Sequence, residues 1–130
     1  MGDGAAGTYR LPRAARMRRR EEFTRTMRRG RSRSRSAFTL YALAVPGEGR
    51  RLGLVCGRRV GGAVVRNRVK RRLREIFRQA PALFRDGLWL VAVARPPVAA
   101  LSYDRLRDET LAALAELVGE NNGGPGPNRK

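Results

Sequence analysis

Residues 58–78 read RRVGGAVVRNRVKRRLREIFR, and this stretch decides how the chain is interpreted. Its apolar residues recur at spacings of three and four, which is the period of an amphipathic helix: Val65, Val69, Leu73, Ile76 and Phe77. Pro81 follows, and a proline ends a helix because it lacks a backbone N–H. The sequence therefore predicts a helix over Gly61–Ala80 with one face in the core.

Basic residues occupy the remaining faces of this predicted helix. Arg66, Lys70 and Arg74 follow one another at four-residue steps beside the apolar stripe, and the single acid between positions 61 and 80 is Glu75. Like charges at this spacing destabilise an isolated helix. A phosphate backbone removes the repulsion, because each Lys or Arg displaces a counterion. A solvated surface helix usually carries both signs, so we interpret this helix as an RNA-binding surface.

The charge of the whole chain supports the same interpretation. Its 130 residues include 29 Lys and Arg, 11 Asp and Glu and no His, which gives a net charge of +18. Residues 10–78 hold 23 of the basic residues and 4 of the acidic ones. A polyanion offsets self-repulsion of this size. The length indicates one RNA-binding domain, expected over residues 9–118 between disordered segments at 1–8 and 119–130.

Residues that carry catalysis are scarce in this sequence. Cys56 is the only cysteine, has no histidine partner, and lies in an apolar segment that predicts a small core side chain. A lone cysteine fits a cytoplasmic protein. No Cys/His cluster has the spacing of metal ligands, and no apolar run approaches the ~20 residues of a membrane span. We assign no catalytic residue and no metal ligand to this chain, and any reaction it serves takes its catalytic groups from a partner.

The segments on either side of the basic helix predict a single sheet with helices packed on it. The expected helices are Arg18–Arg29 and Tyr103–Val118, and the expected strands are Ser36–Val45, Arg51–Gly57 and Gly87–Ala94. The order α-β-β-α-β-α is typical of an α+β fold, here a two-layer α/β sandwich.

Turn residues and polarity predict three details of this sheet. Pro46–Gly49 separates the first two strands, which predicts an antiparallel hairpin between them. The unbroken apolar run Gly87–Ala94 predicts a central strand, because both of its faces must be covered. Arg31–Ser36, with the sequence RSRSRS, is interpreted as a flexible basic loop.

The run Arg58–Arg71 resembles the signature of the protein subunit of bacterial ribonuclease P. That signature is a basic pair, a turn, and then Arg-Asn-Arg, an aliphatic residue, Lys and Arg at the start of a helix. Shorter matches follow in order between Tyr9 and Val118: Glu22-Phe23, Phe38-Thr39-Leu40-Tyr41, Leu52–Val55 and Arg95-Pro96. On these motifs the chain is identified as a member of that family.

The resemblance implies a ribonucleoprotein function. Family members bind a large catalytic RNA and assist removal of the 5′ leader from precursor tRNA, while the RNA and its bound Mg²⁺ perform the hydrolysis. Carried over to this chain, the contacts with the catalytic RNA are Arg66, Asn67, Arg68, Lys70, Arg71 and Arg74. The cleft that holds the leader comprises Phe23, Met27 and Tyr41. The family fold also has a left-handed β-α-β crossover, whereas general rules predict a right-handed one.

Three positions depart from the family pattern. Gly62 stands where Asn is common, Met27 replaces an aromatic residue, and Arg72 replaces an aliphatic one. The side chain of Arg72 is expected either to extend outward along its aliphatic stem or to lie at the edge of the core. Phe23 and Met27 also fit ordinary packing of their helix on the sheet.

Two other functions are compatible with parts of the sequence. One is a generic structured-RNA or ribosome-associated binding protein, which the complete motif in register disfavours. The other is a self-sufficient nuclease, which the lack of histidine and of clustered acids in the basic region disfavours.

Overall fold

The structure is a computed structural model that describes residues 11–123, with side chains to Gly119. The helices are α2 (Arg20–Arg29), α3 (Ala63–Arg78) and α4 (Tyr103–Gly123), and the strands are β1 (Arg31–Ser34), β2 (Phe38–Ala44), β3 (Arg51–Val55) and β4 (Leu88–Ala94). Short 3-10 turns are η1 (Arg13–Ala15), η2 (Arg58–Val60) and η3 (Pro96–Ala100). The expected α+β fold with one sheet is confirmed.

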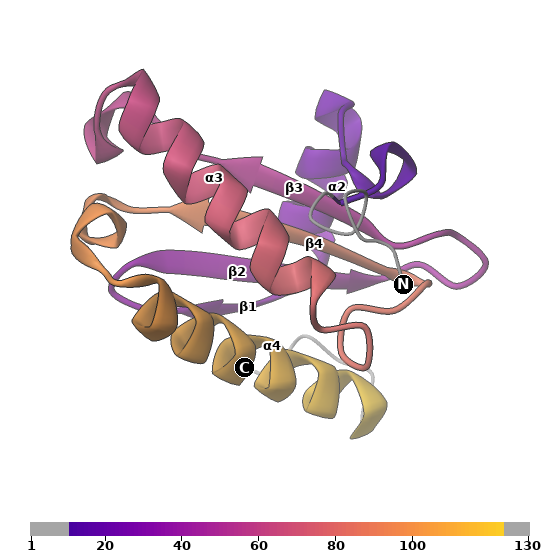
Figure 1. Cartoon of the computed structure of the whole chain (residues 1–130). Coiled ribbons are helices and arrows are strands. Elements are labelled where there is room, and N and C mark those ends of the chain that lie inside the picture. The colour runs from indigo at the N-terminus through magenta and orange to yellow at the C-terminus, as the bar shows by residue number, and fades with distance from the viewer. Residues whose placement is uncertain (1–10, 124–130) are drawn as a thin grey trace, which may run out of the picture.

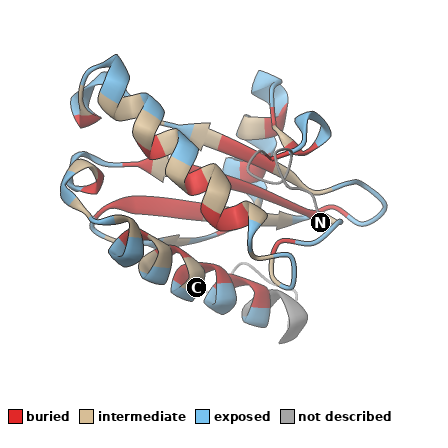
Figure 2. Ribbon diagram, in the orientation of Figure 1, coloured by how far each residue is buried: buried red, intermediate tan, exposed pale blue. Residues whose placement is uncertain are grey.

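Strand β4 lies inside the sheet, whose order is β1-β2-β4-β3. It pairs antiparallel with β2 from Leu88 to Ala94 and parallel with the whole of β3. Its side chains alternate between two buried clusters, so both faces of this strand are covered, and Figure 2 shows the buried band through the middle of the sheet. This confirms the central strand predicted from the unbroken apolar run.

The predicted hairpin between the first two strands is wrong. β2 and β3 run in opposite directions, as expected, but β4 lies between them and pairs with both. The turn residues around Gly47, whose φ is 88°, reverse the chain as predicted. A turn reverses the direction of the chain but does not determine which strands become neighbours in the sheet. β4 takes the position between β2 and β3 because an apolar strand must be covered on both sides.

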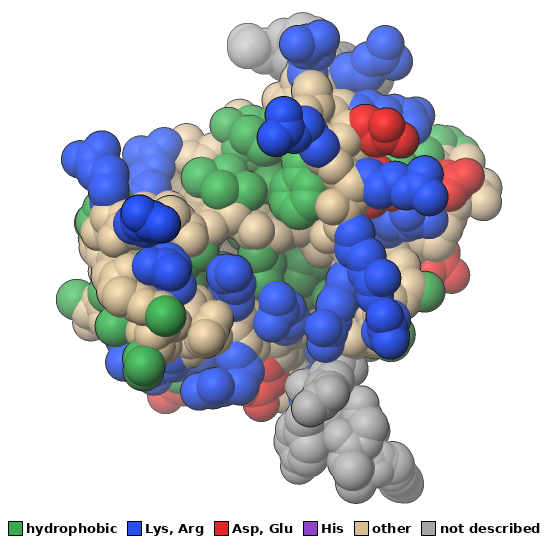
Figure 3. Space-filling model, turned by 90° about the horizontal axis from the view of Figure 1, so that it is seen from above, with side chains coloured by type: hydrophobic (Ala, Val, Ile, Leu, Met, Phe, Trp, Pro, Cys, Tyr) green, Lys and Arg blue, Asp and Glu red, His purple; other side chains and the backbone are tan. Residues whose placement is uncertain are grey.

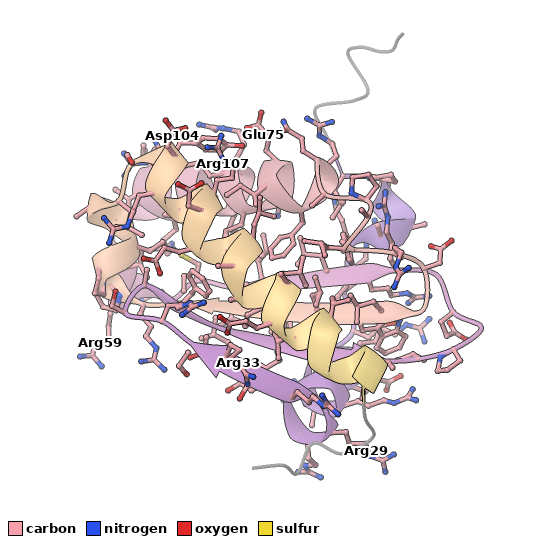
Figure 4. The ribbon with its side chains drawn as sticks, turned by 90° about the horizontal axis from the view of Figure 1, so that it is seen from below. Arg29, Arg33, Arg59, Glu75, Asp104 and Arg107 are labelled. Atoms are coloured by element: carbon pink, nitrogen blue, oxygen red, sulfur yellow. The ribbon has the colours of Figure 1, made fainter. Side chains whose placement is uncertain are left out.

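The interpretation of RSRSRS as a flexible loop is also wrong. Arg31–Ser34 forms the edge strand β1, paired antiparallel with β2. The alternation of Arg and Ser has the two-residue period of a strand, and the arginines lie on the side of α4, as Figure 4 shows for Arg33. Arg33 Nε lies 3.1 Å and Arg35 Nη2 lies 3.3 Å from the Glu116 carboxylate. These pairs order a segment whose composition alone suggests mobility.

Helix α3 makes the crossover between the parallel neighbours β3 and β4. In Figure 1 both strands run to the left, α3 lies in front of the sheet, and the chain steps down from β3 to β4. This is the left-handed sense that the resemblance implies, and it is the exception to the usual right-handed rule.

The two faces of the sheet carry different helices (Figure 1). We call the face that bears Leu40, Leu52 and Leu90 the α3 face, because α3 and α4 cover it and form the main core with it. The opposite face, which we call the α2 face, bears Tyr41 and Trp89 and is partly covered by α2. The main core therefore leaves one side of the sheet incompletely covered.

The helix boundaries differ from expectation at the C-terminus. α4 continues to Gly123, so the expectation of irregular chain from position 119 is wrong for residues 119–123. The expected irregular segment 1–8 and the rest of the tail, 124–130, lie outside the described residues.

Gly30 provides a test of how α2 is attached to the sheet. A Cβ at Gly30 would lie 2.5 Å from the carbonyl oxygen of Thr26 and 2.6 Å from that of Ala42. Because both contacts are backbone atoms, Gly30→Ala is expected to lower the free energy of unfolding by about 1–3 kcal/mol. Urea unfolding followed by circular dichroism measures this change.

The matched control is Gly57→Ala, since a Cβ at Gly57 meets nothing within 4 Å. An unfolding midpoint for Gly30→Ala equal to that of the control would contradict the close approach of α2 to β2.

Candidate nucleic-acid interface

Helix α3 begins at a glycine pair that lets the chain turn sharply after η2. Gly61 has a φ of 156°, and a Cβ there would lie 2.9 Å from the side chain of Val65. Gly62 precedes the first helical residue and provides no side-chain cap. The Arg66 guanidinium instead holds the turn before the helix, by donating from Nη1 to the Gly61 carbonyl at 2.8 Å. The helix therefore begins at Ala63 without the asparagine that is common in the family.

The six predicted contact residues of α3 fall into three positions. Asn67 and Arg71 are exposed on the solvent side. Arg66, Lys70 and Arg74 are half-buried on the side of β3. Arg68 turns the other way, and its Nη2 donates to the Ala99 carbonyl in η3 at 3.2 Å. The structure brings five of the six together over one surface and gives Arg68 a structural bond as well.

Arg72 extends outward instead of entering the core. Its Nη1 donates to the Leu101 carbonyl at 3.2 Å, just beyond η3. Arg68 and Arg72 thus hold the η3 segment against α3 through two backbone carbonyls, a role that the sequence alone did not indicate.

Four cations of α3 form no ion pair with an acid in the described part of the chain. Among residues 11–119, no Asp or Glu forms an ion pair with Arg66, Lys70, Arg71 or Arg74. Burial, with a smaller contribution from nearby Arg16, lowers the pKa of Arg74. A guanidinium still remains charged in a protein. Among the described residues, the charges of these four side chains are therefore not balanced by a carboxylate, whereas Arg33 and Arg35 are paired with Glu116.

A cavity of about 240 Å³ joins α3 to the segment that precedes α2. Its lining combines four cations with four apolar side chains: Arg16, Arg18, Lys70, Arg74, Met17, Phe23, Leu52 and Leu54. Figure 3, which looks toward the β3 edge, shows Lys and Arg side chains around an apolar area. Such a surface can receive a phosphate and an unstacked base together.

The three predicted cleft residues all lie on the α2 side of the sheet. Phe23 and Tyr41 are half-buried and pack against the cluster of Met17, Trp89 and Val91. Met27, one helical turn beyond Phe23, is 37% exposed. Packing and ligand contact are therefore compatible for Phe23 and Tyr41, because each buries one part of its ring and exposes another.

Gly53 lies against the Phe23 ring, and it was not among the residues predicted for the cleft. A Cβ at Gly53 would lie 2.5 Å from Phe23 Cε2 and 3.0 Å from Met17 Sδ. A glycine inside a strand indicates close approach of another group. The glycine in Leu52–Val55 could therefore have indicated that a side chain packs closely on this strand. The edge of the Phe23 ring therefore lies so close to β3 that it leaves no room for a methyl group.

Reactive groups are few in the described part of the chain. Burial raises the pKa of Cys56, although Lys70 and Arg66 act in the opposite direction, so the thiol is not activated. No group of three Asp, Glu or Cys side chains that could hold a metal ion occurs within the described residues. No helix in the same residues has the length and apolarity to cross a membrane. The side chains that α3 and the approach to α2 present are cations and apolar groups, which suit binding of a polyanion.

Comparison with known proteins identifies relatives across most of the chain. Residues 11–118 match the family model described as Ribonuclease P. The ribonuclease P protein component of Streptomyces avermitilis is 39% identical over 118 residues, which cover 84% of this chain and 96% of that protein. The component from Desulfovibrio desulfuricans is 44% identical and covers 85% and 88%.

Solved structures show the same fold. The RNase P protein from Thermotoga maritima is 28% identical, with a TM-score of 0.69 over 78% of this chain and 96% of that chain. The Staphylococcus aureus RNase P protein matches with a TM-score of 0.73 at 24% identity, over 82% and 99%.

Gly53→Ala is expected to displace the Phe23 ring and to weaken binding of single-stranded RNA. The added methyl group lies at the position of the ring edge, so Phe23 must move away from β3. A loss of about tenfold in affinity corresponds to about 1.4 kcal/mol, the size of one base–aromatic contact. Fluorescence anisotropy with a labelled oligoribonucleotide measures it.

The control for this substitution is again Gly57→Ala, together with an unfolding curve for each variant. Wild-type RNA affinity in a folded Gly53→Ala protein would show that the position of Phe23 does not matter for binding.

Proposed function

The chain belongs to the ribonuclease P protein family, and we propose that it binds its RNA partners through two adjoining surfaces, one on α3 and one on the α2 face of the sheet. As the protein subunit of this ribonucleoprotein endonuclease, it serves in maturation of the 5′ end of tRNA. The observation that carries the proposal is that Arg66, Lys70, Arg71 and Arg74 on α3 form no ion pair with an acid within residues 11–119.

The catalytic RNA is the proposed partner of α3. The contact residues are Arg66, Asn67, Arg68, Lys70, Arg71 and Arg74. Forked guanidinium donors match phosphate oxygens, and Asn67 adds an amide that both donates and accepts. Neutralisation by phosphate removes the repulsion between cations at four-residue spacing. The half-burial of Arg66, Lys70 and Arg74 favours this, because partly immobilised side chains lose less entropy on binding.

The 5′ leader of precursor tRNA is the proposed partner of Phe23, Met27 and Tyr41. An unpaired leader offers bases that can stack on aromatic side chains. Phe23 and Tyr41 provide such rings on one face of the sheet, and Met27 offers a polarizable thioether. The cavity shared by Phe23 and Lys70 joins this face to α3, which supports contact with both RNAs at once.

The chemistry of leader removal is assigned to the RNA. The described residues offer no ligand set for a metal ion, so we assign none to this chain. Mg²⁺ bound mainly to the RNA would supply activation of a water molecule and stabilisation of the leaving oxygen. The role of the chain is to hold two RNA molecules in position, as one RNA-binding domain over residues 9–118. We expect it in the cytoplasm, together with its RNA partners.

Arg71→Ala is expected to weaken assembly with a ribonuclease P RNA without changing protein stability. Arg71 is exposed and forms no ion pair among the described residues, so its loss removes a phosphate contact and little else. The slope of log affinity against log salt should fall by about 1. Filter binding over a range of salt concentrations measures it.

Arg68→Ala serves as the comparison, because its guanidinium also bonds to Ala99. It should lower RNA affinity, cleavage at low Mg²⁺ and the free energy of unfolding together. If cleavage of precursor tRNA does not depend on the protein at any Mg²⁺ concentration, the proposed function is wrong.

Tyr41→Ala is expected to weaken precursor tRNA binding by the reconstituted enzyme and to leave mature tRNA binding unchanged. Loss of one stacking platform costs about 1–3 kcal/mol per base. Equilibrium binding of the two tRNAs by wild-type and variant enzyme measures the difference.

Tyr41→Phe keeps the ring and removes only the hydroxyl, so it should retain most of the precursor affinity. An equal loss for precursor and mature tRNA would exclude the leader as the ligand of Tyr41.

A further inference from the structure

A second hollow, of about 350 Å³, lies on the other side of the segment that precedes α2. We call it the arginine basin, because five of its lining residues are arginines: Arg13, Arg16, Arg18, Arg19 and Arg51. They come from η1, from the approach to α2 and from the first residue of β3. None of them is among the contact residues proposed above for α3 and the cleft, although Arg16 and Arg18 also line the neighbouring cavity.

The backbone that carries these arginines is anchored to the sheet. Arg16 forms a parallel bridge with Leu52 at the outer edge of β3, and the Met17 N–H donates to the Leu52 carbonyl at 2.9 Å. Ala15 and Met17 are buried in the two core clusters, whereas Arg16 is half-buried and Arg18 is exposed. Arg16 Nε also donates to the Leu11 carbonyl at 3.2 Å. The cations are therefore held on ordered backbone.

The one acid in the lining is already engaged. Glu22 is 8% exposed, and its Oε1 accepts from the Arg18 and Arg19 N–H groups at 3.3 and 3.4 Å. Its Oε2 forms an ion pair with Arg51. Arg19 reaches Glu21 only at 4.0 Å, between two largely exposed side chains, where an ion pair contributes little. Arg13, Arg16 and Arg18 form no ion pair within the described residues.

The lining of the basin favours a phosphate-rich ligand without a base slot. Ala14 is the only lining residue with an apolar side chain, and no aromatic ring lines the basin, so it offers no aromatic platform for a base. Forked guanidinium donors on three sides suit phosphate oxygens. The neighbouring cavity differs in its residue types, because the Phe23 ring and three other apolar side chains form part of its wall. The basin would hold the backbone of a nucleic acid, and the cavity its bases.

The basin adjoins the proposed leader cleft. Arg16 and Arg18 line both hollows, so one strand of RNA can contact both. Arg51 precedes Gly53 by two residues, about 7 Å along β3, and Gly53 lies directly under the Phe23 ring. Arg51 also lies over the Trp89 ring on the α2 face, at 5.3 Å from its centroid. A strand that leaves Phe23 along β3 therefore reaches the basin.

We propose that the arginine basin binds backbone phosphates of the precursor tRNA leader, upstream of the nucleotides held by Phe23 and Tyr41. This rests on the proposed function, since it presumes that the cleft holds the leader. It assigns a second, base-independent contact to the same strand, so long leaders bind more tightly than short ones whatever their sequence.

The test uses the enzyme reconstituted with a ribonuclease P RNA and precursor tRNAs whose leaders increase in length. The variant is Arg13→Gln with Arg19→Gln, which leaves Arg51 and its ion pair with Glu22 intact. The matched control is Arg85→Gln with Arg105→Gln, two exposed arginines that lie outside both hollows. Equilibrium affinity is measured over a range of salt concentrations.

The expected result is a loss of affinity that appears only with long leaders. For those leaders the salt slope should fall by about 1.4, since each phosphate contact on a single strand contributes about 0.7. The shortest leader, and the control at every length, should match the wild type. This pattern would support the basin as a leader contact.

Three other outcomes would overturn the proposal. An equal loss at all lengths, with weaker assembly of the enzyme, would place the catalytic RNA in the basin. Loss of inorganic pyrophosphate binding to the variant protein alone, without a leader-length effect, would indicate a site for free oligophosphates. No difference from the control would exclude a phosphate contact. If even the wild-type protein fails to assemble with the RNA, the proposed function itself fails, whatever the variants do.

Discussion

The burial of β4 on both faces is the constraint on which the rest of the structure depends. An unbroken apolar strand must have a neighbour on each side and a layer on each face, and β2 and β3 provide the two neighbours. Because β3 then runs parallel to β4, the chain needs a long crossover, and α3 provides it. The position of α3 beside the β3 edge, where its cations meet Arg16 and Phe23, is thus a consequence of how β4 is covered.

The distribution of acidic partners separates structural arginines from available ones. Arg33 of β1 reaches Glu116 on α4, Arg35 just after β1 reaches Glu109 and Glu116, and Arg51 reaches Glu22. The exposed pairs with α4 add little stability, but together with the partly buried Arg51–Glu22 pair they engage acids that would otherwise be available to other arginines. The excess charge of the chain is therefore concentrated around the β3 edge, on α3 and on the approach to α2. In this way much of the net charge of +18 lies on one side of the molecule.

Under the proposed function, the same edge explains how this chain serves a reaction whose chemistry is assigned to the RNA. The hollow shared by Phe23 and Lys70 places an apolar floor beside cations, and the basin beyond it offers cations alone. A strand of RNA that crosses both meets a place for its bases and then a place for its phosphates. Positioning of this kind lowers the entropy cost of bringing two RNA molecules together.

The sequence by itself determined the helix of α3, the central position of β4 and the need for a polyanionic partner, because these depend on local periodicity, apolar content and charge. It also carried the family motif from Arg58 to Arg71. The order of the strands, the pairing of RSRSRS as β1, and the bonds from Arg68 and Arg72 to η3 were decided by tertiary structure. Turn residues and alternation describe a segment and its direction, whereas adjacency in a sheet and the partner of a long cation depend on segments far away in the chain. For that reason the basic residues could be identified from the sequence alone. Only the tertiary structure showed which of them already bond to other parts of the chain and which are available to bind RNA.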